Sequence, residues 1–144
     1  MVPIEQYIEF AQNHMLLVGA LVVTLAMLTH NLLGSRLRGF KSVSPAEATQ
    51  LINREDAVVL DVREDNEYHT GHILNSVHIP LGRVKSRLGE LEQYRNKPVI
   101  VGCRSGSRSG HVCSVLKKSG FESVYNLGGG IMAWQNANLP VSKK

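Results

Sequence analysis

The residue with the clearest chemistry in this 144-residue chain is Cys103. It follows the short apolar run 98–102 and precedes Arg-Ser-Gly-Ser-Arg-Ser, a turn of small residues with two arginines. Such a turn can direct successive backbone N–H groups inward, and a helix that begins there adds partial positive charge. These features favour the thiolate, the nucleophilic form of cysteine. A thiolate is the nucleophile that attacks sulfane sulfur, and the same turn would hold the resulting persulfide anion.

The elements around this loop are predicted from the alternation of short apolar runs with helical patterns. Such alternation is typical of an α/β fold with a mostly parallel central sheet and helices on both faces. Ligand sites in these sheets lie at the carboxyl ends of strands, where Asp61 and Cys103 are both found. A capping box at Ser44 and Glu47 marks the start of one helix. The expected strands are 57–61, 98–102 and 123–127, and the expected helices are 45–53, 81–94, 107–119 and 130–137.

Three segments resemble signatures of the rhodanese-like domain family, and they occur in the family's order. Residues 103–109 are similar to the C-x-S-G-x-R-S active-site loop. Residues 61–73, with His78-Ile79-Pro80, resemble the upstream signature. Asn138 is a departure, because the family often has a glycine nearby, but asparagine tolerates positive φ better than most residues. The C-terminal signature is matched by Gly120, Phe121, Val124, Leu127, Gly128, Gly129, Trp134, Leu139 and Pro140.

The resemblance covers roughly residues 43–141 and implies a sulfurtransferase without cofactor or metal. Cys103 would be catalytic, taking sulfur from a small donor such as thiosulfate and passing it to a thiol or protein acceptor. Asp61 and Arg63 would support the site, either as nearby charges or, as we prefer, by fixing the exit of the strand. The residues expected to bind the transferred sulfur and the donor anion are Arg104, Ser105, Gly106, Ser107 and Arg108.

Two other functions are open for such a domain. Cysteine-dependent phosphatases, including arsenate-reductase-like relatives of this fold, use a C-x5-R loop, whereas Arg108 stands one residue closer to Cys103. The shorter loop should form a narrower cradle, which suits one sulfur atom better than a phosphate. A rhodanese-like domain can also act mainly as an interaction or regulatory module, although inactive versions usually lack the cysteine. Sulfur transfer is therefore the favoured function.

Other reactive side chains have structural explanations as well as chemical ones. Cys113 could resolve a persulfide on Cys103 into a disulfide, but a cysteine among aliphatic residues is more often a packed hydrophobe. His69 and His72 could share a helical face as metal ligands. Gly71 lies between them and no cysteine pair accompanies them, so we expect no metal site.

The N-terminal part of the chain differs in composition from the rest. Asp, Glu, Lys and Arg are absent from Phe10 to Ser35, and residues 15–33 would rise about 28 Å as a helix, close to a bilayer core of roughly 30 Å. We expect a single transmembrane helix. A buried core helix is one alternative, and a cleaved signal peptide is another, disfavoured because Glu5 and Glu9 stand where a signal has basic residues.

Charge placement predicts both topology and partners. All 16 Lys and Arg residues follow the span, which predicts an outside N-terminus and a cytoplasmic domain at a bacterial-type inner membrane. The net charge of +4 fits Arg36, Arg38 and Lys41 meeting anionic lipid rather than nucleic acid. An anchored domain also leaves room for contact with other membrane proteins. The expected parts are an N-terminal segment 1–35, a basic linker 36–42 and a rhodanese-like domain 43–141.

Overall fold

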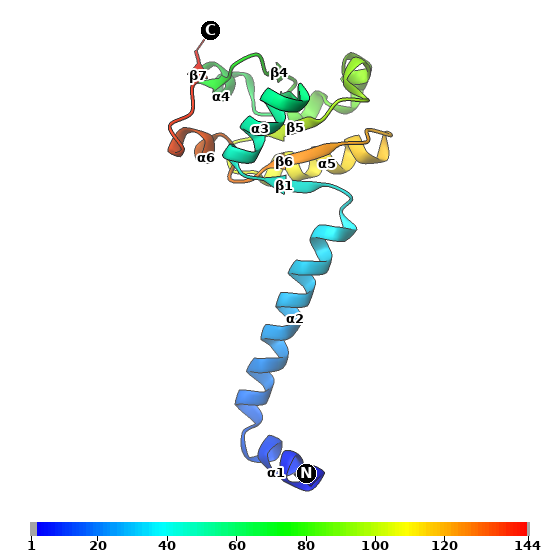
Figure 1. Cartoon of the computed structure of the whole chain (residues 1–144), viewed down its shortest axis with the longest axis vertical. Helices are drawn as coiled ribbons and strands as arrows, with labels where there is room; N and C mark the ends of the chain where they lie inside the picture. Colours follow the sequence, from blue (N-terminus) through cyan, green and yellow to red (C-terminus); the bar gives the residue numbers. More distant parts are fainter. Residues whose placement is uncertain (1–2, 144) are drawn as a thin grey trace. The chain divides into compact units, whose positions relative to one another are not determined.

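The computed structural model describes residues 3–143, with the backbone alone at Ser35 and Arg36, and divides into two compact units between Leu37 and Arg38 (Figure 1). The membrane-edge role expected for the Arg36 side chain therefore lies outside the described residues. The first unit contains helix α1 (Ile4–Asn13), which the sequence did not predict, and helix α2 (Met15–Leu37). Helix α2 continues four residues beyond the expected end of the span at residue 33 and enters the expected linker.

Helix α2 is long and apolar enough to cross a membrane. Its stretch Met15–Gly34 has a mean hydropathy of 2.0, and none of it is buried. An unburied apolar surface of this length is unlike the core helix of a soluble domain, which hides its apolar face. A signal sequence near the N-terminus can have the same length and composition as a membrane anchor. Helix α2 is therefore a candidate membrane span.

The second unit is built on a five-stranded parallel sheet with strand order β1-β6-β5-β2-β4. The three predicted strands are confirmed, each beginning one residue later than expected. Strands β1 and β4 were not predicted, because two or three residues are too few to show a period, and β1 begins in the expected linker and ends at the first residue of the expected domain. The strands of this sheet are β1 (Lys41–Val43), β2 (Val58–Asp61), β4 (Val77–His78), β5 (Val99–Gly102) and β6 (Val124–Leu127).

Three of the four predicted helices are confirmed, as α3 (Pro45–Glu55), α5 (Ser107–Lys118) and α6 (Gly130–Asn136). The capping box is present, since the Ser44 hydroxyl accepts the Glu47 N–H and the Glu47 carboxylate accepts the Ser44 N–H. The prediction of one helix over 81–94 was wrong in type. That stretch forms two 3₁₀ segments, η1 (Leu81–Arg83) and η2 (Lys85–Tyr94), with non-helical backbone at Arg87. Glycines at 82 and 89 lower its helix propensity.

Two short elements complete the domain. Helix α4 (Asp65–His69) follows β2, and strands β3 (His72–Ile73) and β7 (Val141–Ser142) form a separate antiparallel pair. None of the three was predicted. Helix α4 begins shortly after the carboxyl end of β2, so it lies at the edge of the sheet where the sequence places the candidate site.

The core has two parts, one on each face of the sheet, because successive strand residues point to opposite sides. Leu60 belongs to the cluster that includes Val112 and Leu116 of α5, whereas its neighbour Val59 belongs to the cluster that includes Trp134 of α6. Trp134 is buried and its indole N–H donates to the carbonyl of Pro140 at 3.0 Å. Packing on both faces holds the strand ends in register, with Asp61 of β2 beside Gly102 of β5.

Candidate active site

Cys103 directly follows β5 at the carboxyl edge of the sheet, and only 1% of its surface is exposed. Its Sγ accepts the backbone N–H of Gly106 at 3.1 Å and the hydroxyl of Ser109 at 3.3 Å. Gly106 has φ +99° and serves as the N-cap of α5, so the chain turns sharply around the sulfur before the helix begins. The sulfur therefore lies at the start of α5, where a helix favours negative charge.

Helix α6 holds the loop in this orientation. The carbonyls of Cys103 and Arg104 accept N–H groups of Ile131 at 2.8 Å and Met132 at 3.2 Å. These donors belong to the first turn of α6, whose N–H groups have no partner within their own helix. Because the carbonyls face α6, the peptide groups of the loop can present N–H groups on the other side. A Cβ at Gly130 would lie 2.4 Å from the Cys103 carbonyl oxygen, so this close approach requires glycine.

The surroundings of Cys103 favour its ionised form. Burial raises the pKa of this thiol, but hydrogen bonds from the Ser109 hydroxyl and from the N–H groups of Ser109, Gly106 and Ser105 outweigh it. The net result is a pKa below the ordinary value for cysteine. A buried thiolate held by several donors is a preorganised nucleophile.

Asn126 of β6 connects the loop to the sheet. Its amide nitrogen donates to the Gly106 carbonyl at 3.1 Å, and its amide oxygen accepts from the Ser109 hydroxyl at 2.6 Å. A hydroxyl carries one proton, so Ser109 can donate to Asn126 or to the sulfur, but not fully to both. Neither Ser109 nor Asn126 was among the expected site residues. Ser109 lay within the loop motif, whereas no sequence pattern pointed to Asn126.

The two loop arginines have different surroundings. Arg108 donates two hydrogen bonds to the Glu67 carboxylate, at 2.8 and 2.7 Å. This contact lowers the pKa of Glu67 from 4.5 to about 2, although burial opposes the shift. Arg104 is exposed, and no ion pair joins it to any residue between 3 and 143. The positive charge of Arg108 is thus compensated, and that of Arg104 is not.

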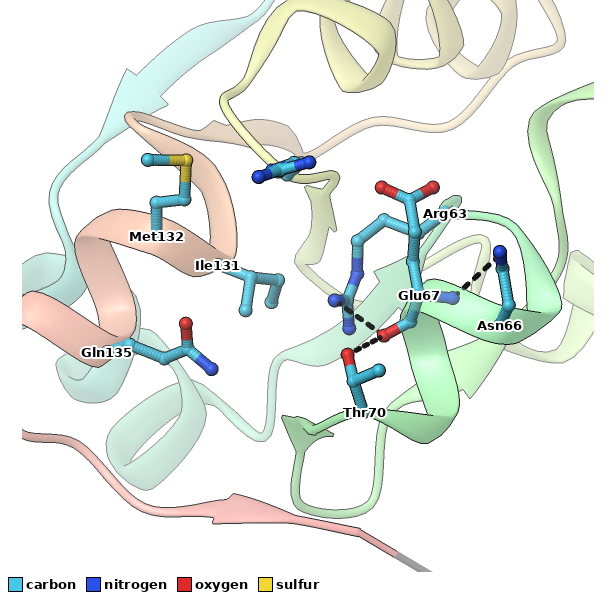
Figure 2. A pocket seen from close by; sticks show the side chains of 8 residues that line it. Arg63, Asn66, Glu67, Thr70, Ile131, Met132 and Gln135 are labelled. Carbon is cyan, nitrogen blue, oxygen red and sulfur yellow. Dashed lines mark hydrogen bonds between the residues drawn. The ribbon is translucent and has the colours of Figure 1, made fainter.

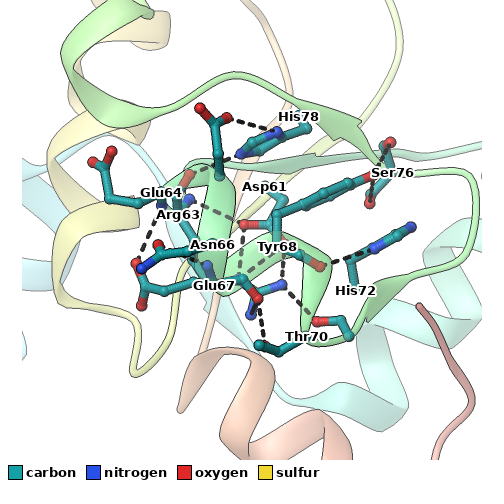
Figure 3. Close-up of polar contacts among 12 residues, drawn as sticks. Asp61, Arg63, Glu64, Asn66, Glu67, Tyr68, Thr70, His72, Ser76 and His78 are labelled. Atoms are coloured by element: carbon teal, nitrogen blue, oxygen red, sulfur yellow. Dashed lines mark hydrogen bonds and ion pairs between the residues drawn. The ribbon is translucent and has the colours of Figure 1, made fainter. Parts of the chain in front are cut away.

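Asp61 and Arg63 form a buried ion pair at the end of β2, with 1% and 4% of their surfaces exposed (Figure 3). The Arg63 guanidinium donates to Asp61 from Nε and Nη2, and further to the carbonyls of Glu67 at 3.0 Å and Gly71 at 2.8 Å. Its donors therefore anchor the middle of α4 and the segment that follows α4 to the end of β2. These contacts hold Glu67 where its carboxylate reaches Arg108.

Comparison with known proteins assigns this arrangement to a family. The model of the rhodanese-like domain matches residues 44–137. The chain belongs to the rhodanese-like domain family. It is 39% identical over 127 residues to YibN of Escherichia coli K12, an uncharacterized protein, covering 88% of this chain and 83% of YibN. It is 35% identical over 98 residues to the thiosulfate sulfurtransferase GlpE of Pseudoalteromonas translucida, covering 68% of this chain and 91% of GlpE.

A solved structure shares the fold of this rhodanese-like domain. A rhodanese-related protein from Thermoplasma volcanium aligns with a TM-score of 0.66 and 32% identity, covering 73% of this chain and 100% of that protein. The expected α/β rhodanese fold with a parallel sheet between helices is thereby confirmed.

A pocket of about 450 Å³ opens beside residues 103–109 of the rhodanese-like domain, which we call the sulfur loop (Figure 2). One side is formed by α4 and the residue after it, and the opposite side by α6. The side chains that line it are Arg63, Asn66, Glu67, Thr70, Arg104, Ile131, Met132 and Gln135.

The remaining candidate residues from the sequence, Cys113 and His72, are engaged in packing contacts. Cys113 is buried on the sheet-facing side of α5, and burial raises the pKa of its thiol to about 12, which disfavours the thiolate needed for disulfide exchange. The His72 ring stacks on Tyr68 at 3.8 Å, and its Nδ1 bonds the Tyr68 carbonyl at 3.1 Å. Among residues 3–143 no cluster of three His, Cys, Asp or Glu is arranged to hold a metal.

Proposed function

We propose that this chain is a membrane-anchored sulfurtransferase that moves a sulfane sulfur through a persulfide on Cys103. The observation that carries the proposal is the environment of Sγ, which accepts hydrogen bonds from Gly106 and Ser109 at the start of α5. A loop that stabilises negative charge on Sγ would also favour the anionic outer sulfur of a persulfide held beside it. The thiosulfate sulfurtransferase activity named for the GlpE relatives supports the same chemistry.

The reaction proceeds in two displacements. The Cys103 thiolate attacks the outer sulfur of a donor such as thiosulfate, the sulfur–sulfur bond of the donor breaks, and sulfite leaves with the bonding electron pair. A thiol acceptor then removes the outer sulfur and restores the thiolate. No electrons enter or leave the protein, so the proposed reaction needs no cofactor. Loop residues 104–108 surround the transferred sulfur and the donor anion.

The roles of the supporting residues follow from their contacts. Arg104, with its uncompensated charge, attracts the donor anion to the loop. Arg108 is held by Glu67, which keeps the first turn of α5 in place. The Asp61–Arg63 pair fixes α4, and through it Glu67. Its contribution is positioning rather than direct contact with the sulfur.

The phosphatase alternative fits these contacts poorly. A phosphatase loop needs its arginine free to bind a tetrahedral oxyanion with both arms of the guanidinium. Arg108 already directs two N–H groups to Glu67. Together with the short C-x4-R spacing, this pairing favours transfer of a single sulfur atom.

The membrane anchor is the second part of the proposal. The stretch Met15–Gly34 of α2 would span the bilayer once within the N-terminal segment 1–35, and residues 43–141 would form the catalytic domain on the cytoplasmic side. Basic residues on one side of the span support this orientation. Membrane lipid, and other membrane proteins that share the bilayer, would then be the neighbours of the domain.

The test is to incubate the reduced full chain, in detergent, with thiosulfate and to record its intact mass. We expect wild type and Cys113→Ser to gain the mass of one sulfur atom and Cys103→Ser to gain none. A wild-type chain that takes no sulfur from thiosulfate or polysulfide would instead indicate a membrane-tethered interaction module. Sulfur retained by Cys103→Ser would disprove the assignment of the nucleophile.

A further inference from the structure

Helix α1 carries an apolar face that stays exposed throughout the described range 3–143. Ile4, Tyr7, Ile8 and Ala11 recur every three or four residues and therefore share one side of the helix. No residue of α1 is buried, and the first three of these side chains are 74%, 62% and 53% exposed. A continuous apolar face that remains exposed indicates a surface that another molecule covers.

The other side of α1 is polar but carries no positive charge. The first 14 residues of the chain contain two glutamates and neither lysine nor arginine. Attraction to an anionic headgroup or to a nucleic acid phosphate therefore does not bring α1 to its partner. The contact must come from burial of the apolar face. The polar residues of the helix are Glu5, Gln6, Glu9, Gln12 and Asn13.

A single residue, His14, connects α1 to the candidate span in α2 (Figure 1). Its backbone, with φ −129° and ψ 42°, ends α1, and its N–H donates to the Phe10 carbonyl at 3.0 Å. The break frees α1 from the axis of α2. Tyr7 and Ile8 line a shallow hollow together with Met15, the first residue of the span. The apolar surface of α1 thus continues into that of α2.

The length of α1 decides which part of a bilayer it can reach. Ten residues rise about 15 Å as a helix, only half of a bilayer core of roughly 30 Å, so α1 cannot be a second span. If α2 enters the bilayer at Met15, α1 ends two residues from the membrane boundary. Tyr7 suits that boundary, because its ring is apolar and its hydroxyl is polar.

We propose that α1 is an interfacial helix whose apolar face inserts between the headgroups and the acyl chains of the outer leaflet. The inference goes beyond sulfur transfer and rests only on the membrane-anchor part of the proposed function. Tyr7 and Ile8 enter the lipid, while Glu5 and Glu9 remain in water. In this position α1 fixes the depth at which the span begins.

The experiment measures the depth of neighbouring side chains with nitroxide labels. Single cysteines are introduced in the full-length Cys103→Ser chain, where Cys113 stays unlabelled because burial raises its pKa to about 12. Intact mass checks that the chain without a new cysteine takes up no label. The labelled chains are reconstituted in phosphatidylcholine vesicles. Collision rates are then measured with oxygen, which concentrates among acyl chains, and with a water-soluble nickel chelate present on both sides.

Adjacent residues of α1 provide the matched comparison. The ratio of oxygen to nickel collision rates should be several-fold higher for Ile8→Cys than for Glu9→Cys, because only the first faces lipid. Ala11→Cys and Gln12→Cys should repeat this difference about one turn later. Adding phosphatidylglycerol should leave both differences unchanged, since no basic residue of α1 attracts anionic lipid. A difference seen only with phosphatidylglycerol would overturn the inference.

The remaining outcomes separate this inference from the proposed function. Low ratios at both positions of each pair would place α1 in water and overturn the interfacial helix. Protection of Ile8→Cys from both reagents, with spin–spin broadening between labels, would show that a second copy of the chain covers the face instead. Leu25→Cys, in the middle of the span, should have a high ratio. A low ratio there would overturn the membrane anchor itself, and with it this inference, but not the persulfide on Cys103.

Discussion

The carboxylate of Glu67, on α4, binds the guanidinium of Arg108, on the first turn of α5, through two hydrogen bonds of 2.7 and 2.8 Å. The two residues are 41 positions apart in the chain, yet their contact joins α4, which lines the pocket, to the first turn of α5, which follows the sulfur loop. Both side chains are partly exposed, at 25% and 34%. The pair therefore contributes to stability and also decides which arginine of the loop is available to ligands.

Glu67→Gln is expected to make the domain less stable in a pH-dependent way. The folded-state pKa of Glu67 is lowered from 4.5 to about 2, mainly by the Arg108 hydrogen bonds, so its contribution is full above pH 4.5 and is lost as the pH falls through about 2. At pH 7 we expect a loss of about 1–2 kcal/mol after allowance for solvent screening. Thermal unfolding can be followed by the fluorescence of Trp134, the single tryptophan.

Glu92→Gln is the matched control for this measurement. It removes a similar two-bond contact with Arg95, but both partners are more exposed, at 51% and 37%. Exposed pairs contribute little because water screens them. A gap between wild type and Glu67→Gln that persists unchanged down to pH 2 would show that ionisation of Glu67 is not its cause.

Ser109→Ala is expected to raise the pKa of Cys103. The substitution removes the hydroxyl donor at 3.3 Å from Sγ, so the thiolate loses stabilisation that offsets its burial. The pH profile of iodoacetamide alkylation at Cys103, located by mass, should therefore move to higher pH. Ser114→Ala, on the same helix with its hydroxyl bonded to the Gly110 carbonyl, should leave the profile in place. Coincident profiles for wild type and Ser109→Ala would exclude the hydroxyl as a stabiliser.

The proposed nucleophile and its loop could be located from the sequence because the relevant residues lie together. Cys103 to Ser109 form one continuous motif, and the strand before it is a plain apolar run. The fold could be predicted for the same reason, since strands β2, β5 and β6 and their helices each carry a local pattern. Local patterns were sufficient wherever the function depends on neighbours in sequence.

Contacts between distant segments could not be predicted in this way. Asn126 reaches Gly106 from 20 residues away, and its residue type is unremarkable for a strand end. Glu67 reaches Arg108 only because the five-residue helix α4, too short to show a helical period, is pinned by Arg63. Two loop arginines that look equivalent in sequence thus differ in charge compensation, and only the tertiary structure reveals which one is available.

Asn126→Asp is expected to slow persulfide formation by reducing the fraction of Cys103 that is present as the thiolate. The carboxylate loses the donor to the Gly106 carbonyl and draws the Ser109 proton away from the sulfur. The pKa of Cys103 should rise, so raising the pH should restore the rate of charging by thiosulfate. Asn53→Asp, an equal charge change at an exposed position of α3, is the control. A slower rate that high pH does not restore would indicate a purely structural role for Asn126.

Gly130→Ala is expected to displace the sulfur loop. A Cβ at this position would lie 2.4 Å from the Cys103 carbonyl oxygen and 2.5 Å from the Arg104 carbonyl carbon, and the residue has φ +60°. We expect a loss of about 2 kcal/mol or more in stability and a slower charging rate. Gly82→Ala, which meets nothing within 4 Å, should change stability by less than about 0.5 kcal/mol. Equal behaviour of the two variants would mean that α6 does not constrain the loop.

The topology prediction concerns the candidate span Met15–Gly34. If it anchors the chain with the domain in the cytoplasm, the full-length chain should stay in membranes washed at alkaline pH. External protease should spare residues 41–144 in spheroplasts and digest them in inverted vesicles, because basic residues keep that side inside. A soluble chain that lacks its first residues would show a cleaved signal sequence instead. Digestion in spheroplasts would reverse the orientation and place Cys103 in an oxidising compartment, where a free thiol would be harder to maintain.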